Sequence, residues 1–295
     1  METRYAIVEA PSNLGLAPTG VDTLPEALLR AGLLDRLGAR HATRVVPRHG
    51  YDDRRDPANG GTLNATGIAA YGVDLAAAVG AVLDAGERPL VLGGDCSILL
   101  GPLLALRRRG RHGLLFVDGH ADFYQPEANP NGQAASMELA FVTGRGPDVV
   151  ANLEGRRPLV ADTDVVVLGF RDAEEQAAYG SQPLPSQMIA FDLAAVRRDG
   201  AEAVVRQSLA QLTRSGGPGR FWLHIDADVL DDAIMPAVDY RQPDGLSWDE
   251  LQIVVRTAHA SEALVGLDVT IYNPALDRDG AGARGLVDVL AGALA

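Results

Sequence analysis

Seven short apolar runs recur along the chain, and segments with helical spacing lie between and around them. The apolar runs occupy residues 5–10, 89–94, 113–118, 164–170, 188–193, 221–228 and 264–271. The helical patterns occupy residues 23–34, 66–85, 98–109, 136–144, 172–179, 200–214, 247–260 and 283–294. Strands that are apolar along their whole length, alternating with helices, are typical of a parallel sheet covered on both faces. The sequence therefore predicts an α/β protein.

The sequence shows no boundary that would divide this pattern. It has no internal repeat, no low-complexity linker and no shift in composition, and the Gly/Pro-rich stretch 214–220 is a simple connection. Its 295 residues, 47% of them hydrophobic, can form a large core. We expect one domain spanning residues 1–295.

Charge and cysteine content exclude several classes of partner. A net charge of −13 would repel nucleic acids and anionic membranes. The single cysteine excludes an internal disulfide and fits a reducing compartment. No apolar signal segment or run of about 18 apolar residues is visible. We therefore expect a cytoplasmic protein that acts on a small molecule, with no nucleic acid and no membrane as partner.

Polar residues directly follow four of the apolar runs. These stretches are Asp95-Cys96-Ser97, Asp118-Gly119-His120-Ala121-Asp122, Arg171-Asp172 and Asp226-Ala227-Asp228. In open parallel sheets, ligands bind beyond the carboxyl ends of the strands, where loops and helix N-termini meet. The pattern therefore predicts a functional site at this edge.

The spacing within two of these stretches favours metal binding. Asp118, His120 and Asp122 share one side if the chain stays extended, and neighbours in this series, two residues apart, are then separated by roughly 6.6–7 Å. Asp226 and Asp228 repeat the alternation. A single aspartate after a strand is commonly only a helix cap or turn residue. Four such carboxylates would repel one another, the stretches offer too little arginine or lysine, and two divalent cations would balance their charge.

These motifs together resemble those of a known family. "GGDCS" (93–97), "DGHAD" (118–122), "DADVLDD" (226–232) and "LDVTIYNPALD" (267–277) occur in the order of the four signatures of the ureohydrolase (arginase/agmatinase) family. The resemblance covers nearly the whole chain. It implies a three-layer α/β/α fold with a mostly parallel sheet, assembled as a trimer or hexamer. It also implies two manganese ions and a metal-bridging hydroxide that hydrolyses a guanidinium C–N bond and releases urea.

The resemblance also implies a role for each acidic residue. Asp118 and Asp226 would bridge the two metals. Asp122 would complete the first metal and act in catalysis by hydrogen bonding to the hydroxide. His120 and Asp228 would complete the second metal.

Cys96 departs from the family pattern, because the family usually has a histidine ligand at this position. A thiolate ligand on the first metal would shift the preference from Mn²⁺ toward Zn²⁺, Co²⁺ or Fe²⁺. Alternatively, Cys96 is a small buried apolar residue. A third possibility is that the first site is weak and only the site containing His120 fills.

Two departures concern the chemistry next to the metals. Ala135 stands where the family has a proton-relaying histidine, so either Tyr124, Glu127 or Glu138 assists the leaving amine or the leaving group needs less help. Ile271 stands where an acidic residue pairs with the guanidinium, and a cation buried there would lack its partner.

Other positions bear on the substrate. Asn131 matches a serine that contacts the substrate, and Glu174 matches an aspartate that contacts the substrate's α-amino group. Glu174 can equally be a solvated carboxylate at a helix start. The polar loop 239–244 could alter the pocket.

Three functions follow for this divergent member. The first is a metal-dependent hydrolase that cleaves a C–N bond of a guanidino or amidine-type small molecule and releases urea. The second is a deacetylase-like hydrolase of the amide in an acylated amine, which Ile271 would suit. The third is a metal-binding member without catalysis, since both Ala135 and Ile271 replace functional residues.

Overall fold

The computed structural model describes residues 4–295. Within this range the strands form one eight-stranded sheet in the order β2-β1-β3-β8-β7-β4-β5-β6, and every pairing is parallel. The strands are β1 (Tyr5–Ala10), β2 (Arg40–Arg44), β3 (Arg88–Gly93), β4 (Gly113–Val117), β5 (Val165–Leu168), β6 (Ile189–Phe191), β7 (Phe221–Asp226) and β8 (Leu264–Thr270). Seven lie where the apolar runs predict them. The eighth, β2, was missed because its sequence RHATR is polar and half exposed.

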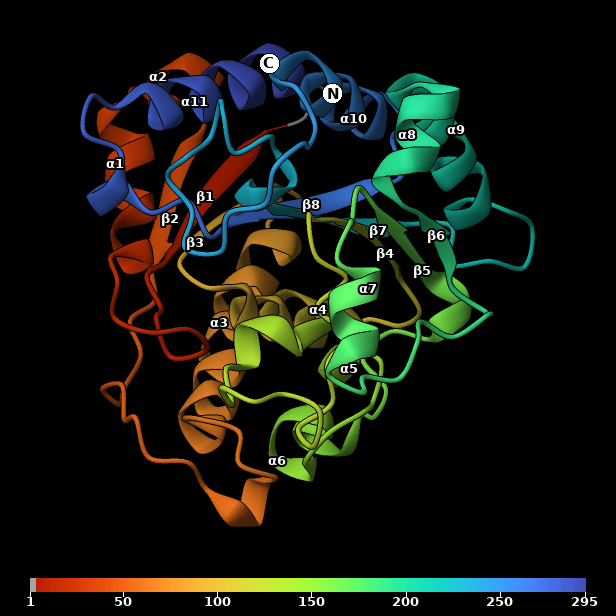
Figure 1. Ribbon diagram of the computed structural model, residues 1–295. Helices are drawn as coiled ribbons and strands as arrows, with labels where there is room; N and C mark the ends of the chain where they lie inside the picture. The colour runs from red at the N-terminus through yellow and green to blue at the C-terminus, as the bar shows by residue number, and fades with distance from the viewer. Residues whose placement is uncertain (1–3) are drawn as a thin grey trace.

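Helices cover both faces of this sheet, as Figure 1 shows. The helices are α1 (Leu24–Arg30), α2 (Leu33–Leu37), α3 (Ala65–Asp84), α4 (Leu100–Arg107), α5 (Glu138–Val142), α6 (Asp148–Ala151), α7 (Ala173–Ala178), α8 (Leu193–Asp199), α9 (Ala201–Leu212), α10 (Trp248–Ala260) and α11 (Ala281–Leu294). Helices α1, α2 and α8–α11 contribute to one core and α3–α6 to the other. The three-layer α/β/α fold is confirmed.

One predicted helix and one predicted strand differ from the structure. The expected helix at 23–34 is divided into α1 and α2 at Gly32, whose φ of 90° lies in the left-handed region that glycine adopts easily. The expected strand at 188–193 ends early, because the Asp192 side chain accepts a hydrogen bond from the Ala195 amide and starts α8.

The central strands are apolar throughout because their two faces lie in different cores. On β4, Leu115 and Val117 belong to one core, whereas Leu114 and Phe116 belong to the other. Among the described residues one helix, α3, is long and apolar enough to cross a membrane. It packs mainly on α4, and ten of its residues are buried. We therefore interpret α3 as a core helix.

Candidate metal centre and pocket

All six residues predicted as metal ligands converge at the carboxyl edge of the central strands. Three groups of donor atoms each lie within 4.8 Å of one another. The groups are Cys96–Asp118–His224–Asp226, Cys96–Asp118–Asp122–Glu138, and Asp118–His120–Asp228. Asp118 belongs to all three, so it is the centre of the cluster. Glu138 and His224 join it as well.

Turns, and not continued strands, bring these side chains together. The Asp118 carboxylate accepts a hydrogen bond of 2.7 Å from the His120 amide, and the Asp226 carboxylate accepts one of 2.7 Å from the Asp228 amide. Such aspartate turns bend the chain at the end of each strand. Asp122 then adopts a left-handed φ of 43°. The predicted alternation along an extended strand is therefore corrected, because the chain curls around the cluster instead.

The cluster holds buried polar atoms that the protein does not satisfy. Within residues 4–295, Asp118 Oδ2, both carboxylate oxygens of Glu138 and His224 Nε2 have no hydrogen-bond partner. Arg171 is nearby, and its Nη2 donates to backbone carbonyls, including that of Asp228 at 2.9 Å. Its Nε and Nη1 also lack partners in the described chain, and its one charge cannot balance the several carboxyl groups. Buried polar groups without partners are costly. The residues present therefore fit a cationic ligand.

Burial has a strong effect on the acidity of the cluster. It raises the pKa of Asp118, Asp122 and Asp226 well above the usual carboxyl range, and neighbouring carboxylates raise it further. Burial likewise raises the pKa of the Cys96 thiol and of Glu138. The chain alone therefore favours protonated groups here, whereas bound cations would favour the ionised forms.

His120 and Asp228 form an ion pair of 2.9 Å within this cluster. Burial opposes both charges, but their mutual attraction outweighs it. The pKa of Asp228 is lowered, and the pKa of His120 is raised to about 10. Without a metal, these two residues neutralise each other.

Cys96 lies among the donor atoms and is fully buried. Its Sγ donates to Asp226 Oδ2 at 2.7 Å and lies 3.1 Å from Thr270 Oγ1. A thiol that only filled apolar space would not need these contacts, so the geometry supports a ligand role.

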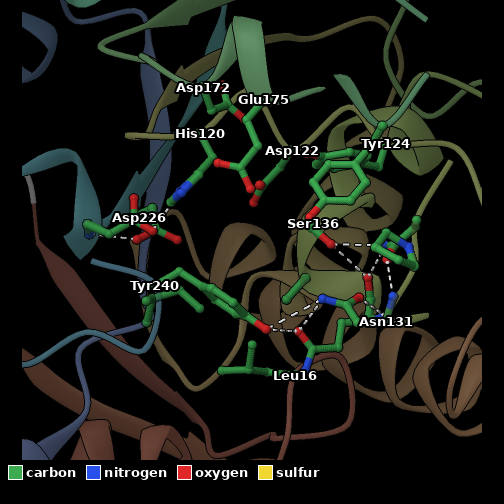
Figure 2. A pocket seen from close by; sticks show the side chains of 17 residues that line it. Leu16, His120, Asp122, Tyr124, Asn131, Ser136, Asp172, Glu175, Asp226 and Tyr240 are labelled. Carbon is green, nitrogen blue, oxygen red and sulfur yellow. Dashed lines mark hydrogen bonds and ion pairs between the residues drawn. The ribbon is translucent and has the colours of Figure 1, made fainter. Parts of the chain in front are cut away.

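A pocket of about 190 Å³ opens onto the cluster. Figure 2 shows His120, Asp122 and Asp226 on its wall, with Tyr240 and Asn131 on the opposite side from Asp172 and Glu175. The lining residues are Leu16, His120, Asp122, Tyr124, Asn129, Pro130, Asn131, Gln133, Ala135, Ser136, Asp172, Glu175, Tyr179, Asp226, Asp228, Tyr240 and Ile271. No lysine or arginine of the described chain is among them.

The two predicted substrate contacts lie in different environments. Asn131 lines the pocket, and its Nδ2 donates to Gln133 Oε1 at 3.1 Å. Tyr240 donates to the same oxygen at 2.7 Å, which holds this rim in place. Glu174 is exposed and does not line the pocket, whereas the next residue, Glu175, does.

Ile271 forms part of the apolar wall. Its backbone has φ = 67°, and its amide donates to the Gly94 carbonyl at 2.9 Å. A β-branched residue in the left-handed region is strained, and such strain persists where the surroundings impose it. The acidic partner for a guanidinium is therefore replaced by a hydrophobic side chain held in an unusual conformation.

Comparison with known proteins agrees with this geometry. A sequence model described as "Arginase family" matches residues 3–295. The chain belongs to the arginase family. It is 29% identical to an arginase of Bacillus subtilis (strain 168) over 280 residues, covering 94% of this chain and 93% of that protein. It is 28% identical to an arginase of Bacillus caldovelox over 278 residues, covering 92% and 91%.

Solved structures of the family have the same fold. The native structure of the Bacillus caldovelox arginase aligns with a TM-score of 0.87 at 25% identity, covering 99% of this chain and 98% of that one. A Burkholderia thailandensis protein titled a hypothetical agmatinase aligns with a TM-score of 0.71 at 19% identity, covering 99% and 85%. This second similarity concerns the fold alone.

Two members of the cluster were not predicted as metal donors. His224 lies inside the apolar run FWLHI, two residues before Asp226. The period of two along a strand, counted backward from Asp226, was the signal available. Glu138 was predicted only as a possible aid to the leaving group. It starts α5, where an acidic residue is ordinarily explained by the helix dipole.

Proposed function

We propose that this arginase-family chain is a metal-dependent hydrolase that cleaves a C–N bond of a guanidino or amidine-type small molecule. One observation carries the proposal: buried donor atoms without hydrogen-bond partners converge beside a small pocket. The family membership supports the type of bond, because named relatives are arginases. A cytoplasmic homo-oligomer, trimeric or hexameric, built from one domain per chain, is part of the same proposal.

We assign the cluster to two divalent ions. Asp118 and Asp226 would be shared, Cys96 and Asp122 would complete one site, and His120 and Asp228 would complete the other. Two such ions, when bound, lower the pKa of a water molecule between them and so supply a nucleophile at neutral pH. Manganese is expected by family resemblance, whereas a Cys96 thiolate favours Zn²⁺, Co²⁺ or Fe²⁺.

The chain's own residues would handle the proton. Asp122 lines the pocket, and its carboxylate can accept a hydrogen bond from the attacking water. Glu138 lies beside Asp122 in a fully buried position, and burial raises its pKa. We propose that Glu138, which does not line the pocket itself, supplies through Asp122 the proton that Ala135 cannot relay. Tyr124, which lines the pocket, is the alternative donor. Glu127 is exposed and outside the pocket lining, so we do not assign it this role.

The pocket favours a substrate with a cationic tail and a weakly charged reacting group. Asp172 and Glu175 supply negative charge, and no lysine or arginine in residues 4–295 lines the pocket to bind a carboxylate. Asn131 supplies a polar contact on the opposite side. Next to the metals, Ile271 offers no charge partner, which disfavours a permanently charged guanidinium.

The test is urea and ammonia release from a panel of guanidino and amidine compounds, with Mn²⁺, Co²⁺, Zn²⁺ or Fe²⁺ supplied separately. We expect turnover with at least one metal, and loss of turnover in Asp226→Asn. The apolar wall at Ile271 favours a second candidate, hydrolysis of an acylated amine. Acetate release without urea would select that function. If the metal-bound protein released neither urea or ammonia nor acetate, both catalytic functions would be contradicted. The protein would then be a non-catalytic member of the family.

A further inference from the structure

We infer that His224 is a ligand of the ion held by Cys96, Asp118 and Asp226. This inference rests on the proposed metal centre and adds an imidazole to its deeper site. The ion would then have one sulfur, one nitrogen and carboxylate oxygens as donors, a set that suits Zn²⁺ or Co²⁺.

The sheet places His224 directly beneath the cluster. On β7 it is paired with Phe116 of β4 and Asp268 of β8. Asp226 follows two residues later on the same face of the strand, so the imidazole lies one step below a ligand carboxylate. The ring stacks on Phe116 with centroids 4.7 Å apart and is fully buried. Its orientation is therefore set by packing.

A buried carboxylate holds the other nitrogen of the ring. His224 Nδ1 lies 2.6 Å from one oxygen of Asp268, and the other oxygen accepts a hydrogen bond from the Trp222 indole. An Nδ1–H that donates to a carboxylate leaves the lone pair on Nε2. Metal-binding histidines almost always donate their other ring N–H to a carboxylate, a backbone carbonyl or a water molecule, which fixes the tautomer and the ring.

The free nitrogen faces the cluster. Nε2 lies 4.0 Å from Asp118 Oδ2, and within the described part of the chain neither atom has a hydrogen-bond partner. At this separation they are too far apart to hydrogen bond to each other directly. Four ligand atoms at about 2.0–2.3 Å from one tetrahedral ion lie roughly 3.3–3.8 Å apart. The donor atoms of the group Cys96–Asp118–His224–Asp226 all lie within 4.8 Å of one another, so small side-chain movements would gather them around one ion.

The test measures metal stoichiometry, affinity and the ligand set, with Co²⁺ and Zn²⁺ as probes. In the wild-type protein, X-ray absorption should report two imidazole donors over two ions. His224→Gln should lower the affinity for one ion at least about 100-fold and leave the ion at His120 bound. His259→Gln is the matched control, because His259 contacts Tyr5 and Arg88 away from the cluster, and it should change neither value.

Asp268→Asn tests the tautomer with a side chain of the same shape. The asparagine amide would donate to Nδ1, so Nε2 would carry the hydrogen and lose its lone pair. We expect an affinity loss of about 10–100-fold at one ion. A purely structural role for His224 predicts no such loss in a folded Asp268→Asn variant.

Nitrogen NMR of the wild-type histidines tests the inference without any substitution. Zn²⁺ should shift the Nε2 resonance of His224. If two ions bind and neither this resonance nor the imidazole count involves His224, the inference is wrong and the metal centre stands. If the wild-type protein binds no ion, the proposed metal centre itself fails.

Discussion

Two buried aspartates lie at opposite edges of neighbouring strands. Asp164 precedes β5, and Asp118 follows β4. Asp164 receives 2.6 and 2.7 Å hydrogen bonds from the Arg111 guanidinium and a 3.2 Å bond from Arg214. Asp118 receives one bond, from the His120 amide, and its second oxygen has no partner within residues 4–295.

The difference teaches how the chain separates structural from functional carboxylates. Both are essentially inaccessible to water, so both need compensation for lost hydration. At the amino-terminal edge the chain supplies arginines from two elements. At the carboxyl-terminal edge it gathers more acids, and Arg171 is directed to backbone carbonyls. In the proposed metal centre, bound cations would supply the compensation at that edge.

Substitution of Asp118 should have the largest effect on function. Asp118→Asn removes the residue shared by all three donor groups. We expect activity to fall at least about 1,000-fold, beyond the 10–100-fold typical of groups that only orient a ligand. Metal binding, measured by elemental analysis, should fall with it. The metal-free variant should melt no lower than metal-free wild type, because a carboxyl group whose ionisation is disfavoured by burial is replaced by a neutral amide of the same shape.

Asp164→Asn is the matched control and should show the opposite pattern. It leaves Arg111 and Arg214 without their buried partner, although both guanidinium groups are partly exposed and screened by water. We expect a cost of about 1–2 kcal/mol in the free energy of unfolding and no change in metal stoichiometry. Equal destabilisation of the metal-free protein by both substitutions would contradict the distinction between a structural Asp164 and a functional Asp118.

Removal of the metal should have the next largest effect, here on thermal stability. A ligand present at 100 times its Kd stabilises the folded state by about 2.7 kcal/mol. At about 2–4 °C per kcal/mol, exhaustive chelation should lower the Tm by roughly 5–10 °C at pH 8. Differential scanning calorimetry with and without a chelator measures this, and the Asp118→Asn variant should respond little. An unchanged wild-type Tm would argue that the carboxylates need no ion.

The stability of the metal-free protein and that of the metal-bound protein should depend on pH in different ways. Burial raises the folded-state pKa of Asp118, Asp122 and Asp226, so their protonated forms stabilise the fold below the unfolded pKa. That stability is lost as the pH rises toward the folded pKa. The raised pKa of His120, about 10, acts in the same direction, whereas the lowered pKa of Asp228 opposes it.

Between pH 5 and pH 8, the metal-free protein should therefore lose stability. Ligands must lose protons to bind a metal, so added metal should stabilise more at pH 8 than at pH 5. Urea unfolding curves at both pH values, with and without metal, measure this. A constant gap between the loaded and metal-free curves would show that no ligand proton is coupled to metal binding.

The sequence predicted the edge of the sheet at which the site lies, but it did not identify every donor residue of the cluster. Asp118 and Asp226 were recognisable because each ends an apolar run, and parallel strands end at one edge. The contact between His224 and Asp268 could not be recognised, since the two residues are 44 positions apart and their pairing depends on β7 lying beside β8. Strand order is a property of tertiary packing, which local patterns do not specify.

The prediction of the substrate contacts was limited in a similar way, here by a difference of one residue position. Motif alignment pointed to Glu174, but in α7 adjacent residues face different directions, about 100° apart. The bend that starts this short helix decides which carboxylate enters the pocket, and it presents Glu175. The stretch DAEEQ contains two adjacent glutamates, and a motif comparison does not resolve which of them faces the pocket.

The smallest predicted effect concerns these two glutamates, which extend the comparison to carboxylates in contact with water. Neither forms an ion pair in the part of the chain that the structure describes, and only Glu175 lines the pocket. Glu175→Gln should raise the KM for a cationic substrate about 3–5-fold with kcat little changed, because an exposed charge contributes about 1 kcal/mol or less. Glu174→Gln should leave KM within twofold, and raised salt should narrow the difference. Equal KM values for both variants, or a larger effect at Glu174, would show that the carboxylate at the pocket mouth has no part in substrate binding.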